Sequence, residues 1–237
     1  MKASVVIPVF NERKSLPLVV SDLPLELLHE IVVVDNASTD GTALVARDLP
    51  VRLVQEPRRG YGSACLAGVA ALESDPPEVI VFLDGDYSDH PEQITRLLEA
   101  VAAGADLVIG SRTLGEREPG ALLPQARFGN LLACFLIRIL YGHRYTDLGP
   151  FRAIRWEAYR RIGMADTNFG WTCEMQVKAV REGLAITEVP VSYRRRVGVS
   201  KITGTVAGTF RAGYKILWTI ARYGLKRGKR EAGNGKR

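Results

Sequence analysis

The first half of the sequence contains five short apolar runs that are rich in β-branched residues. Runs that are nearly continuous in apolar side chains are typical of strands covered on both faces. The predicted strands are Val5–Phe10, Ile31–Asp35, Val51–Gln55, Val79–Asp84 and Leu107–Gly110. Each run is followed by polar residues or glycine, which marks its end.

The segments between these strands have the apolar spacing of helices. Helices are expected over Ser15–Leu23, Asp40–Asp48, Gly62–Glu73 and Pro91–Ala103. Pro91 in the first turn of the last segment, with Glu92 behind it, is a typical helix start. The regular alternation predicts a Rossmann-like α/β fold with a mainly parallel sheet and helices on both faces. Ligands of such sheets bind at the carboxyl ends of the strands.

The second half follows a different pattern. Its expected elements are a loop at Leu114–Pro124, a helix at Gln125–Tyr141, a strand at Phe151–Ile154, a helix at Cys173–Glu182 and a strand at Ile186–Tyr193. An arginine-rich connector, Arg194–Lys201, then leads to a long amphipathic helix over Thr205–Lys226 and a polar tail. We therefore expect a single domain over residues 1–203, followed by the amphipathic helix and basic tail over residues 204–237.

Charge is distributed unevenly along the 237 residues, whose net charge is +6. From Arg194 to Arg237 there are thirteen basic residues and one acid, whereas the first 193 residues carry 19 basic and 25 acidic residues. The basic end is explained by a helix that lies on a membrane surface, by a helix packed on the body with solvated charges, or by a nucleic-acid contact.

The remaining composition is that of an ordinary folded protein. With 46% apolar and 24% charged residues, disorder, collagen-like repeats and coiled coil are excluded. Three separated cysteines (Cys65, Cys134 and Cys173) favour a reduced, intracellular setting over a disulfide framework. The N-terminal apolar run is too short for a signal peptide, and no run approaches the roughly 20 apolar residues of a membrane span.

Polar residues gather where the predicted strands end. The five ends carry Asn11-Glu12, Asp35-Asn36, Arg59-Gly60, Asp84-Gly85-Asp86 and Ser111-Arg112. A single acidic strand end is readily explained as the cap of the following helix. Five polar ends at one edge of a parallel sheet indicate a ligand site.

Asp84-Gly85-Asp86 carries the most specific chemistry. Residues two apart in extended chain point to the same side, so both carboxylates reach one point. Gly85 permits the close approach of a phosphate. Two hard oxygen ligands that leave room for water and phosphate oxygens suit Mg²⁺ or Mn²⁺, and Asp89 is a candidate third ligand. The alternative is a turn with two capping aspartates, but the position after a buried strand favours the metal.

Two other phosphate-binding patterns are missing from the first strand. It is followed neither by Gly-x-Gly-x-x-Gly nor by a P-loop, which argues against dinucleotide binding of the Rossmann type. Gly60-Tyr61-Gly62 opens a predicted helix, and its backbone N–H groups are candidates for a phosphate contact.

Segments along most of the chain resemble the inverting glycosyltransferases of family 2, which have the GT-A fold. They are, in order, Val6–Glu12, Val34–Thr42, Arg59–Ala64, Asp84–Asp86, Gly110–Arg112, Asp147–Ala153 and Gly198–Lys201. Within this family the chain looks most like the polyprenyl-phosphate (dolichyl-phosphate) mannose and glucose synthases. The resemblance implies a nucleotide-sugar-binding half over residues 1–112 and an acceptor-binding half over residues 113–203.

The resemblance also implies which residues form the donor site. Those that match contacts to the base and ribose of a UDP- or GDP-sugar are Pro8, Phe10, Glu12 and Asp35, with Arg59 and Gly60 beside them. The pair that matches the metal and diphosphate contacts is Asp84 and Asp86. The residues that match a mobile basic segment closing over phosphates are Arg194, Arg196, Ser200 and Lys201.

The candidate catalytic residues are Asp86, Arg112 and Glu174. Arg112 matches a position that meets the phosphate of the acceptor. Many family members carry a Glu-Asp pair that supplies a general base, and Glu174 is the one acid in the corresponding region. A hydroxyl acceptor needs such a base, whereas a phosphate monoester is already anionic at pH 7. Glu174 is therefore a base, a group that orients the sugar, or only a favourable partner of a helix N-terminus.

Two positions depart from the family pattern. Asn36 stands where a second aspartate is common, which bears on the contacts to the base. The stretch Asp86–His90 differs from the Asp-Leu-Gln-His pattern of the mannose synthases. The third metal ligand is therefore left open between Ser88 and Asp89.

We expect a metal-dependent enzyme that moves a hexose, with inversion, from UDP or GDP to a polyprenyl phosphate. Its expected location is cytoplasmic, peripheral at the inner face of the membrane, with the terminal helix on the membrane surface. No nucleic-acid partner is expected, and a homo-oligomer is left open. The main alternative is transfer to a hydroxyl group of a glycan or glycolipid.

Two further classes are less consistent with the sequence. A nucleotidyltransferase of related fold needs a Gly-rich loop ending in arginine after the first strand, and Val9–Glu12 lacks it. A non-catalytic module for lipid or nucleic acid would have no metal-dependent affinity for nucleotides.

Overall fold

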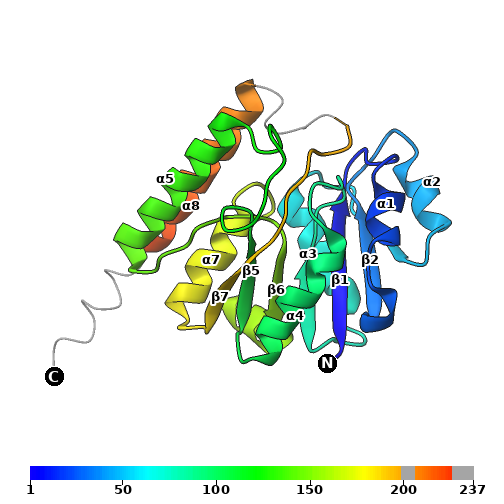
Figure 1. Cartoon of the computed structure of the whole chain (residues 1–237), viewed down its shortest axis with the longest axis horizontal. Coiled ribbons are helices and arrows are strands. Elements are labelled where there is room, and N and C mark those ends of the chain that lie inside the picture. The colour runs from blue at the N-terminus through cyan, green and yellow to red at the C-terminus, as the bar shows by residue number, and fades with distance from the viewer. Residues whose placement is uncertain (199–205, 226–237) are drawn as a thin grey trace.

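The computed structural model describes residues 1–198 and 206–225, and in the last helix it describes the side chains of residues 213–223. A seven-stranded sheet, in the order β3-β2-β1-β4-β6-β5-β7, forms the centre of the fold (Figure 1). Its strands are β1 (Ala3–Val9), β2 (Glu30–Asp35), β3 (Arg52–Gln55), β4 (Val79–Phe82), β5 (Leu107–Ser111), β6 (Arg152–Arg155) and β7 (Ile186–Pro190). The strands predicted from the apolar runs are thus confirmed.

The neighbouring strands pair in parallel, except that β6 is antiparallel to both β4 and β5. This confirms the mainly parallel α/β fold. The reversal of β6 follows from where the chain enters it. Asp147 accepts hydrogen bonds from Arg112, and the carbonyl of Phe151 accepts one from Gly110, so this segment already lies at the carboxyl end of β5. A strand that starts from this edge has to run back across the sheet.

Helices cover both faces of the sheet, as expected (Figure 1). They are α1 (Leu16–Ser21), α2 (Thr42–Arg47), α3 (Tyr61–Leu72), α4 (Ile94–Ala102), α5 (Pro124–Tyr141), α6 (Trp156–Ile162), α7 (Trp171–Arg181) and α8 (Val206–Leu225). One core cluster joins the sheet to α1, α2 and α4. The other joins the opposite face to α3, α5, α6 and α7.

The alternation along β1 shows how the sequence builds these two layers. Val5 and Ile7 belong to the cluster under α1 and α4, whereas Val6 belongs to the cluster under α3. Successive side chains of a strand point to opposite faces, so a continuous apolar run fills both cores. A methyl group on Gly68 of α3 would come within 2.5 Å of Cγ1 of Val6, so the close contact of α3 with β1 depends on this glycine.

Several boundaries differ from the sequence prediction. Helix α6 follows β6 directly and was not predicted. The helix expected from Pro91 begins as a 3₁₀ turn at Pro91–Gln93 and continues as α4. Strand β4 ends at Phe82 rather than Asp84; the N–H of Leu83 still donates to the carbonyl of Val6 at 3.3 Å, and Gly85 and Asp86 form a turn. Asp84 and Asp86 therefore do not lie on one continuous strand.

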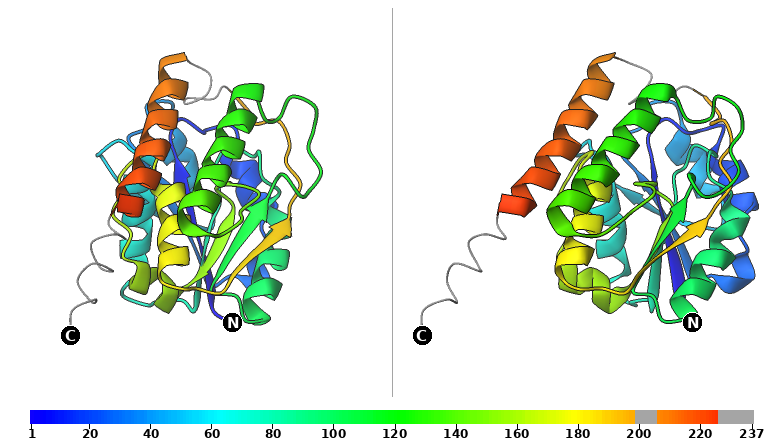
Figure 2. Two further views of the ribbon diagram at one scale, coloured as in Figure 1. Left: turned by 90° about the vertical axis from the view of Figure 1, so that its left-hand side faces the viewer. Right: turned by 60° about the vertical axis from the view of Figure 1, so that its left-hand side comes forward.

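Helix α8 lies on the outside of the molecule, alongside α5 (Figure 2). Its Ile220 is buried in the core cluster, and its backbone carbonyl accepts a hydrogen bond from the hydroxyl of Tyr141 on α5. On α7, Arg181 donates to the carbonyl of Tyr223 at 3.3 Å. The predicted terminal helix is confirmed over Val206–Leu225, and it packs on the body.

Among residues 1–198 and 206–225, no helix combines the length and the apolar composition of a membrane span. Ser200 and Lys201 of the predicted basic segment, and the tail from Gly228, lie outside the described residues.

Candidate functional site

The polar strand ends predicted from the sequence meet at the carboxyl edge of the sheet. The loops after β1, β2 and β4 each hold one residue in the left-handed backbone region: Asn11 (φ 56°), Ala37 (φ 60°) and Tyr87 (φ 64°). No other non-glycine residue in the described part of the chain has a positive φ. Residues with side chains avoid this region, and those held there cluster at functional sites.

Asp84 and Asp86 lie on the turn that follows β4. One oxygen of Asp86 accepts the backbone N–H of Ser88 at 2.9 Å, and the other pairs with the guanidinium of Arg196. Oδ1 of Asp84 is buried and has no hydrogen-bond partner. Burial, and then the charge of Asp86, raises the pKa of Asp84 to about 7. A cation would stabilise this pair of neighbouring carboxylates.

Asp89 lies deeper in the same acidic group. It is 1% exposed, and neither carboxylate oxygen has a hydrogen-bond partner. Burial, followed by the charges of Asp84 and Asp86, raises the pKa of Asp89 well above its ordinary value. The hydroxyl of Ser88, the other candidate third ligand, donates to Asp86.

In the described part of the chain, no group of three or more His, Cys, Asp or Glu side chains is arranged to hold a metal ion. Asp84, Asp86 and Asp89 are thus not arranged as a complete set of metal ligands. A Mg²⁺ site does not need one, because this ion is commonly held by one or two carboxylates together with water and substrate phosphates. The unpartnered oxygen of Asp84 fits that kind of site, and the metal assignment to Asp84, Asp86 and Asp89 stays a prediction.

The arginine-rich connector crosses over the acidic turn. The backbone N–H of Arg194 donates to the carbonyl of Ser88 at 2.9 Å, and that of Val197 donates to the carbonyl of Asp86 at 3.0 Å. The guanidinium of Arg194 stacks 3.3 Å from the centre of the Tyr87 ring. The described part of the connector therefore places Arg194 and Arg196 over the acidic turn, and their contact with phosphates stays a prediction.

Arg196 links two of the predicted site residues. Its guanidinium pairs with Asp86 and lies 3.6 Å from Oε1 of Glu12. Glu12 is 7% exposed, and its other oxygen accepts the hydroxyl of Ser15 at 2.8 Å. Arg196 thus connects the loops that follow β1 and β4.

Phe10 and Arg59 form a pair beside these acids. The guanidinium carbon of Arg59 lies 4.0 Å from the centre of the Phe10 ring, and Nη2 donates to the carbonyl of Ala37 at 3.2 Å. Asp35 is buried at the end of β2, in register with Val9, while Pro8 lies beside Val34. The residues predicted to hold base and ribose are therefore neighbours in space.

Asn36 explains one departure from the family pattern. Its amide nitrogen donates to the carbonyls of Glu56 and Arg58 at 3.0 and 2.8 Å, and its amide oxygen accepts the N–H of Gly60 at 2.8 Å. An aspartate cannot donate the first two bonds. The amide is thus used to join the ends of β2 and β3 to the Gly60 turn.

Arg112 is held by a buried acid that the sequence analysis did not single out. Asp147 accepts the backbone N–H and Nε of Arg112 at 2.8 Å and Nη2 at 2.7 Å. The guanidinium lies 5.0 Å from the centre of the Tyr193 ring. Burial alone would raise the pKa of Asp147, but Arg112 outweighs it and the pKa is lowered. Asp147 thus fixes the orientation of the Arg112 guanidinium.

Glu188 of β7 fixes the backbone at Thr146 and Asp147, and so the position of the acid that holds Arg112. Its carboxylate accepts the backbone N–H groups of Thr146, at 2.9 Å, and Asp147, at 3.2 Å. Burial raises the pKa of Glu188. The pattern of the sequence offered no signal for Asp147 and Glu188 beyond the Asp147–Ala153 motif, because their roles depend on contacts between distant segments.

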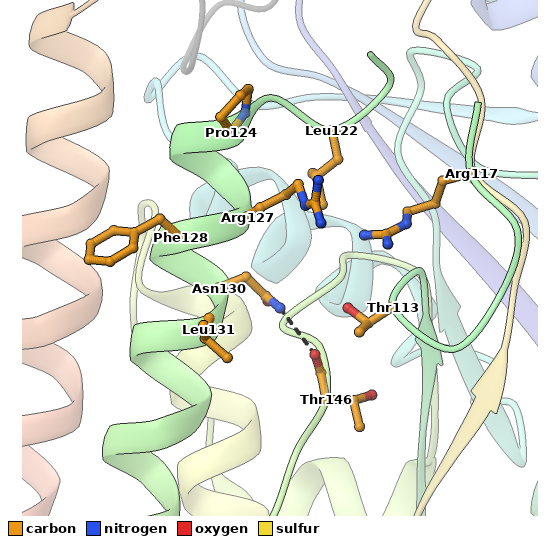
Figure 3. Close-up of a pocket in the computed structure, with 9 residues that line it drawn as sticks. All are labelled: Thr113, Arg117, Leu122, Pro124, Arg127, Phe128, Asn130, Leu131 and Thr146. Atoms are coloured by element: carbon orange, nitrogen blue, oxygen red, sulfur yellow. Dashed lines mark hydrogen bonds between the residues drawn. The ribbon is translucent and has the colours of Figure 1, made fainter. Parts of the chain in front are cut away.

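A pocket of about 390 Å³ opens between α5 and the loop after β5 (Figure 3). Arg117 and Arg127 point into it from opposite sides, and Thr113 and Asn130 line it. Asn130 donates to the carbonyl of Thr146 at 3.1 Å, next to the residue that holds Arg112. Leu122, Phe128 and Leu131 supply the apolar part of the lining. The pocket thus combines two cations with an apolar wall.

Glu174 lies away from the acidic turn and is enclosed. It is 1% exposed, and Oε1 accepts the hydroxyl of Tyr223 at 2.6 Å and pairs with Lys178 at 2.8 Å. Oε2 accepts the backbone N–H groups of Ala165 and Asp166 at 3.1 and 2.7 Å. Its catalytic role stays a prediction, and all its observed contacts are with the protein.

Comparison with known proteins places this chain among glycosyltransferases. Residues 4–163 match the family described as Glycosyl transferase family 2. An undecaprenyl-phosphate mannosyltransferase of Micrococcus luteus is 34% identical, with 95% of each chain covered. A polyprenol monophosphomannose synthase of Mycolicibacterium smegmatis is 33% identical over 85% of this chain and 81% of the relative.

Solved structures show the same fold. Glucosyl-3-phosphoglycerate synthase from Mycobacterium tuberculosis, in complex with Mn²⁺, UDP-glucose and phosphoglyceric acid, superposes with a TM-score of 0.75 at 21% identity. The match covers 94% of this chain and 79% of that chain. The fold is therefore that of the GT-A glycosyltransferases.

Proposed function

The chain belongs to glycosyltransferase family 2, and we propose that it transfers a hexose from UDP or GDP to a polyprenyl phosphate. Two relatives similar over most of the chain are named for mannose transfer to lipid phosphates. The observation that carries the proposal is the pocket of Arg117 and Arg127, which is also lined by Thr113 and Thr146, the chain neighbours of Arg112 and Asp147, and by apolar residues of α5.

On the donor side, we assign the base and ribose to the ends of β1 and β2. Phe10 and Arg59 offer an aromatic face and a guanidinium plane, while Glu12 and Asp35 offer carboxylates for ribose hydroxyls. The Gly60 turn, fixed by Asn36, presents backbone N–H groups at the start of α3.

Asp84 and Asp86 would hold the divalent ion, Mg²⁺ or Mn²⁺, with Asp89 behind them as the candidate third ligand. When bound, such an ion stabilises the negative charge of the departing nucleoside diphosphate. Arg194 and Arg196 lie over the same turn and add charge-assisted hydrogen bonds to phosphate oxygens. For this, Arg196 has to exchange its contact with Asp86 for one with the donor.

On the acceptor side, Arg112, Arg117 and Arg127 bind and orient the lipid phosphate. A phosphate oxygen then attacks the anomeric carbon from the face opposite the leaving diphosphate, which inverts the configuration. No general base is needed, because the attacking oxygen is already anionic. The engaged state of both Glu174 oxygens supports this acceptor over a hydroxyl group.

An exposed apolar surface supports a lipid acceptor. The outer apolar face consists of Phe128, Leu131, Phe135 and Ile139 on α5 and Tyr214, Leu217 and Trp218 on α8. Phe128 and Leu131 are each 68% exposed, and they continue from the wall of the pocket. Large exposed apolar patches mark interaction sites. We propose that this face lies on the inner surface of the cytoplasmic membrane, where the polyprenyl chain is held.

The proposal is tested with purified full-length protein, UDP- and GDP-hexoses, Mn²⁺ or Mg²⁺, and undecaprenyl phosphate in detergent micelles. We expect the sugar label to enter an acid-labile lipid. We expect Arg127→Gln to lower the acceptor kcat/KM by about tenfold or more, because a charge-assisted contact is lost. The matched control is Arg160→Gln, an exposed arginine of α6 that does not line this pocket. Label in a glycan or glycolipid, but not in the lipid phosphate, would favour a hydroxyl acceptor.

A further inference from the structure

Helix α8 contacts the donor half of the protein through one loop. This bridging loop, residues 163–170, connects α6 to α7. Lys215 of α8 pairs with the carboxylate of Asp166 at 2.9 Å. At Gly170, an added methyl group would come within 2.6 Å of both the Asp166 carboxylate and the hydroxyl oxygen of Thr219 on α8. The bridging loop is therefore packed directly against α8.

Glu174 fixes the bridging loop to α8 a second time. Oε2 accepts the N–H groups of Ala165 and Asp166 in the loop, while Oε1 accepts the Tyr223 hydroxyl of α8. Lys178 pairs with Glu174 and donates to the carbonyl of Gly163, at the beginning of the loop. Burial alone would raise the pKa of Glu174, but these partners lower it, which keeps the anchor charged.

The other side of the bridging loop lies against the Gly60 turn. The N–H of Ser63 donates to the carbonyl of Thr167 at 2.9 Å. A methyl group on Gly60 would come within 2.1 Å of that same oxygen, and one on Gly62 within 2.0 Å of the carbonyl oxygen of Asp166. The bridging loop and the Gly60 turn are therefore in direct backbone contact, and Gly60 and Gly62 are needed for it.

We propose that α8 positions the donor site through the bridging loop, with Glu174 and Asp166 as positioning residues. The inference rests on the proposed function, because it takes the Gly60 turn as a nucleotide-sugar contact. Two side-chain contacts, Tyr223–Glu174 and Lys215–Asp166, connect α8 to the bridging loop. The backbone of the loop in turn packs against Gly60 and Gly62, so the position of the loop affects the position of the Gly60 turn. The same helix contributes Tyr214, Leu217 and Trp218 to the outer apolar face. Occupancy of that face and affinity for the donor are therefore coupled.

The test compares Tyr223→Phe with Tyr159→Phe in the full chain. Both changes remove one tyrosine hydroxyl, but the Tyr223 hydroxyl bonds to Glu174, whereas the buried Tyr159 hydroxyl on α6 has no hydrogen-bond partner. Affinities for UDP and GDP are measured by calorimetry with Mn²⁺. We expect Tyr223→Phe to weaken nucleotide binding about fivefold or more and Tyr159→Phe to leave it unchanged. In turnover, we expect the donor KM to rise while kcat is retained.

Amide hydrogen exchange of the Gly60–Ser63 segment tests the coupling without any nucleotide. We expect faster exchange in Tyr223→Phe and in Lys215→Met, and wild-type exchange in Tyr159→Phe. Unchanged exchange and nucleotide affinity in both folded α8 variants would overturn the inference. If wild-type protein binds neither UDP nor GDP, the proposed function fails, and the exchange experiment still decides on the coupling.

Discussion

Asp147 holds the guanidinium of Arg112 through two side-chain hydrogen bonds of 2.8 and 2.7 Å, and its own side chain is fully buried. A bidentate pair of this kind fixes orientation as well as charge. The orientation of Arg112, which we assign to the acceptor phosphate, therefore depends on Asp147, a residue to which we assign no contact with the substrate.

We expect Asp147→Asn to lower the acceptor kcat/KM by about tenfold or more, because an amide has only one acceptor oxygen and its NH₂ group cannot accept the second guanidinium N–H. Steady-state assays over a range of lipid phosphate concentrations measure this. Asp106→Asn is the control, since Asp106 lies at the opposite edge and is 4.0 Å from Arg155. Equal losses in the two variants would contradict a specific role for Asp147.

The same pair predicts a dependence of stability on pH. The pKa of Asp147 is lowered from an ordinary value of 3.8, so its ionised form stabilises the fold above that pH and the contribution is lost as the pH falls. Removal of one partner of a buried pair costs about 3–5 kcal/mol. We expect urea unfolding to show this difference between wild type and Asp147→Asn at pH 7, and a smaller difference below about pH 4. A difference that grows toward acid pH would refute this.

Asn36→Asp is expected to destabilise the protein although it restores the residue common in the family. The carboxylate would face the carbonyls of Glu56 and Arg58, to which the amide now donates, and would leave both without a donor. We expect a loss of about 1–3 kcal/mol in the free energy of unfolding. Asn234→Asp in the tail provides a control for the change in charge. Stability equal to wild type would show that the amide bonds are replaced by water.

Asp84→Asn is expected to remove Mn²⁺-dependent nucleotide binding. The amide nitrogen is not a metal ligand and the site loses one negative charge, so we expect the affinity for UDP or GDP with Mn²⁺ to fall at least about tenfold. Calorimetry with and without EDTA measures the effect. Asp48→Asn at the end of α2 controls for the loss of charge. Retained Mn²⁺ dependence would remove Asp84 from the metal site.

The outer apolar face predicts membrane binding. Phe128→Ser combined with Leu131→Ser is expected to weaken co-sedimentation with vesicles of anionic phospholipid by about tenfold or more, because two exposed apolar side chains no longer enter the interface. Leu44→Ser on α2 is the control, since Leu44 is 65% exposed on a helix of the opposite layer. Binding that is insensitive to the double change would place the membrane contact elsewhere.

Much of the architecture follows from local patterns. The five apolar runs of the first half became strands, because covered parallel strands need apolar residues on both faces, as Val5 and Val6 illustrate. Helix α6 was not predicted, because it begins at Trp156 directly after β6 and no glycine, proline or other turn signal separates the two elements. The direction of β6 was also not predictable, since it depends on where residues 147–151 lie relative to β5.

The acidic turn differs in geometry from what the sequence pattern predicts. Asp84 and Asp86 both lie at the carboxyl edge of the sheet, but a turn after β4 places them there and not alternation along a strand. Their role as metal ligands stays a prediction. Asn36 looked like a change in base recognition and instead joins two strand ends. Hydrogen bonds of this kind connect residues far apart in sequence, so the local pattern of apolar and polar residues does not predict them.

Residue type and local spacing were enough to predict most of the elements, the family and the polar residues at the strand ends. The partners of those residues became known only from the folded structure. Asp147 holds Arg112, Arg196 joins Asp86 to Glu12, and Glu174 binds Tyr223 of α8. Each of these contacts forms because separate segments pack on one core, and packing places side chains within hydrogen-bond distance irrespective of their separation along the chain.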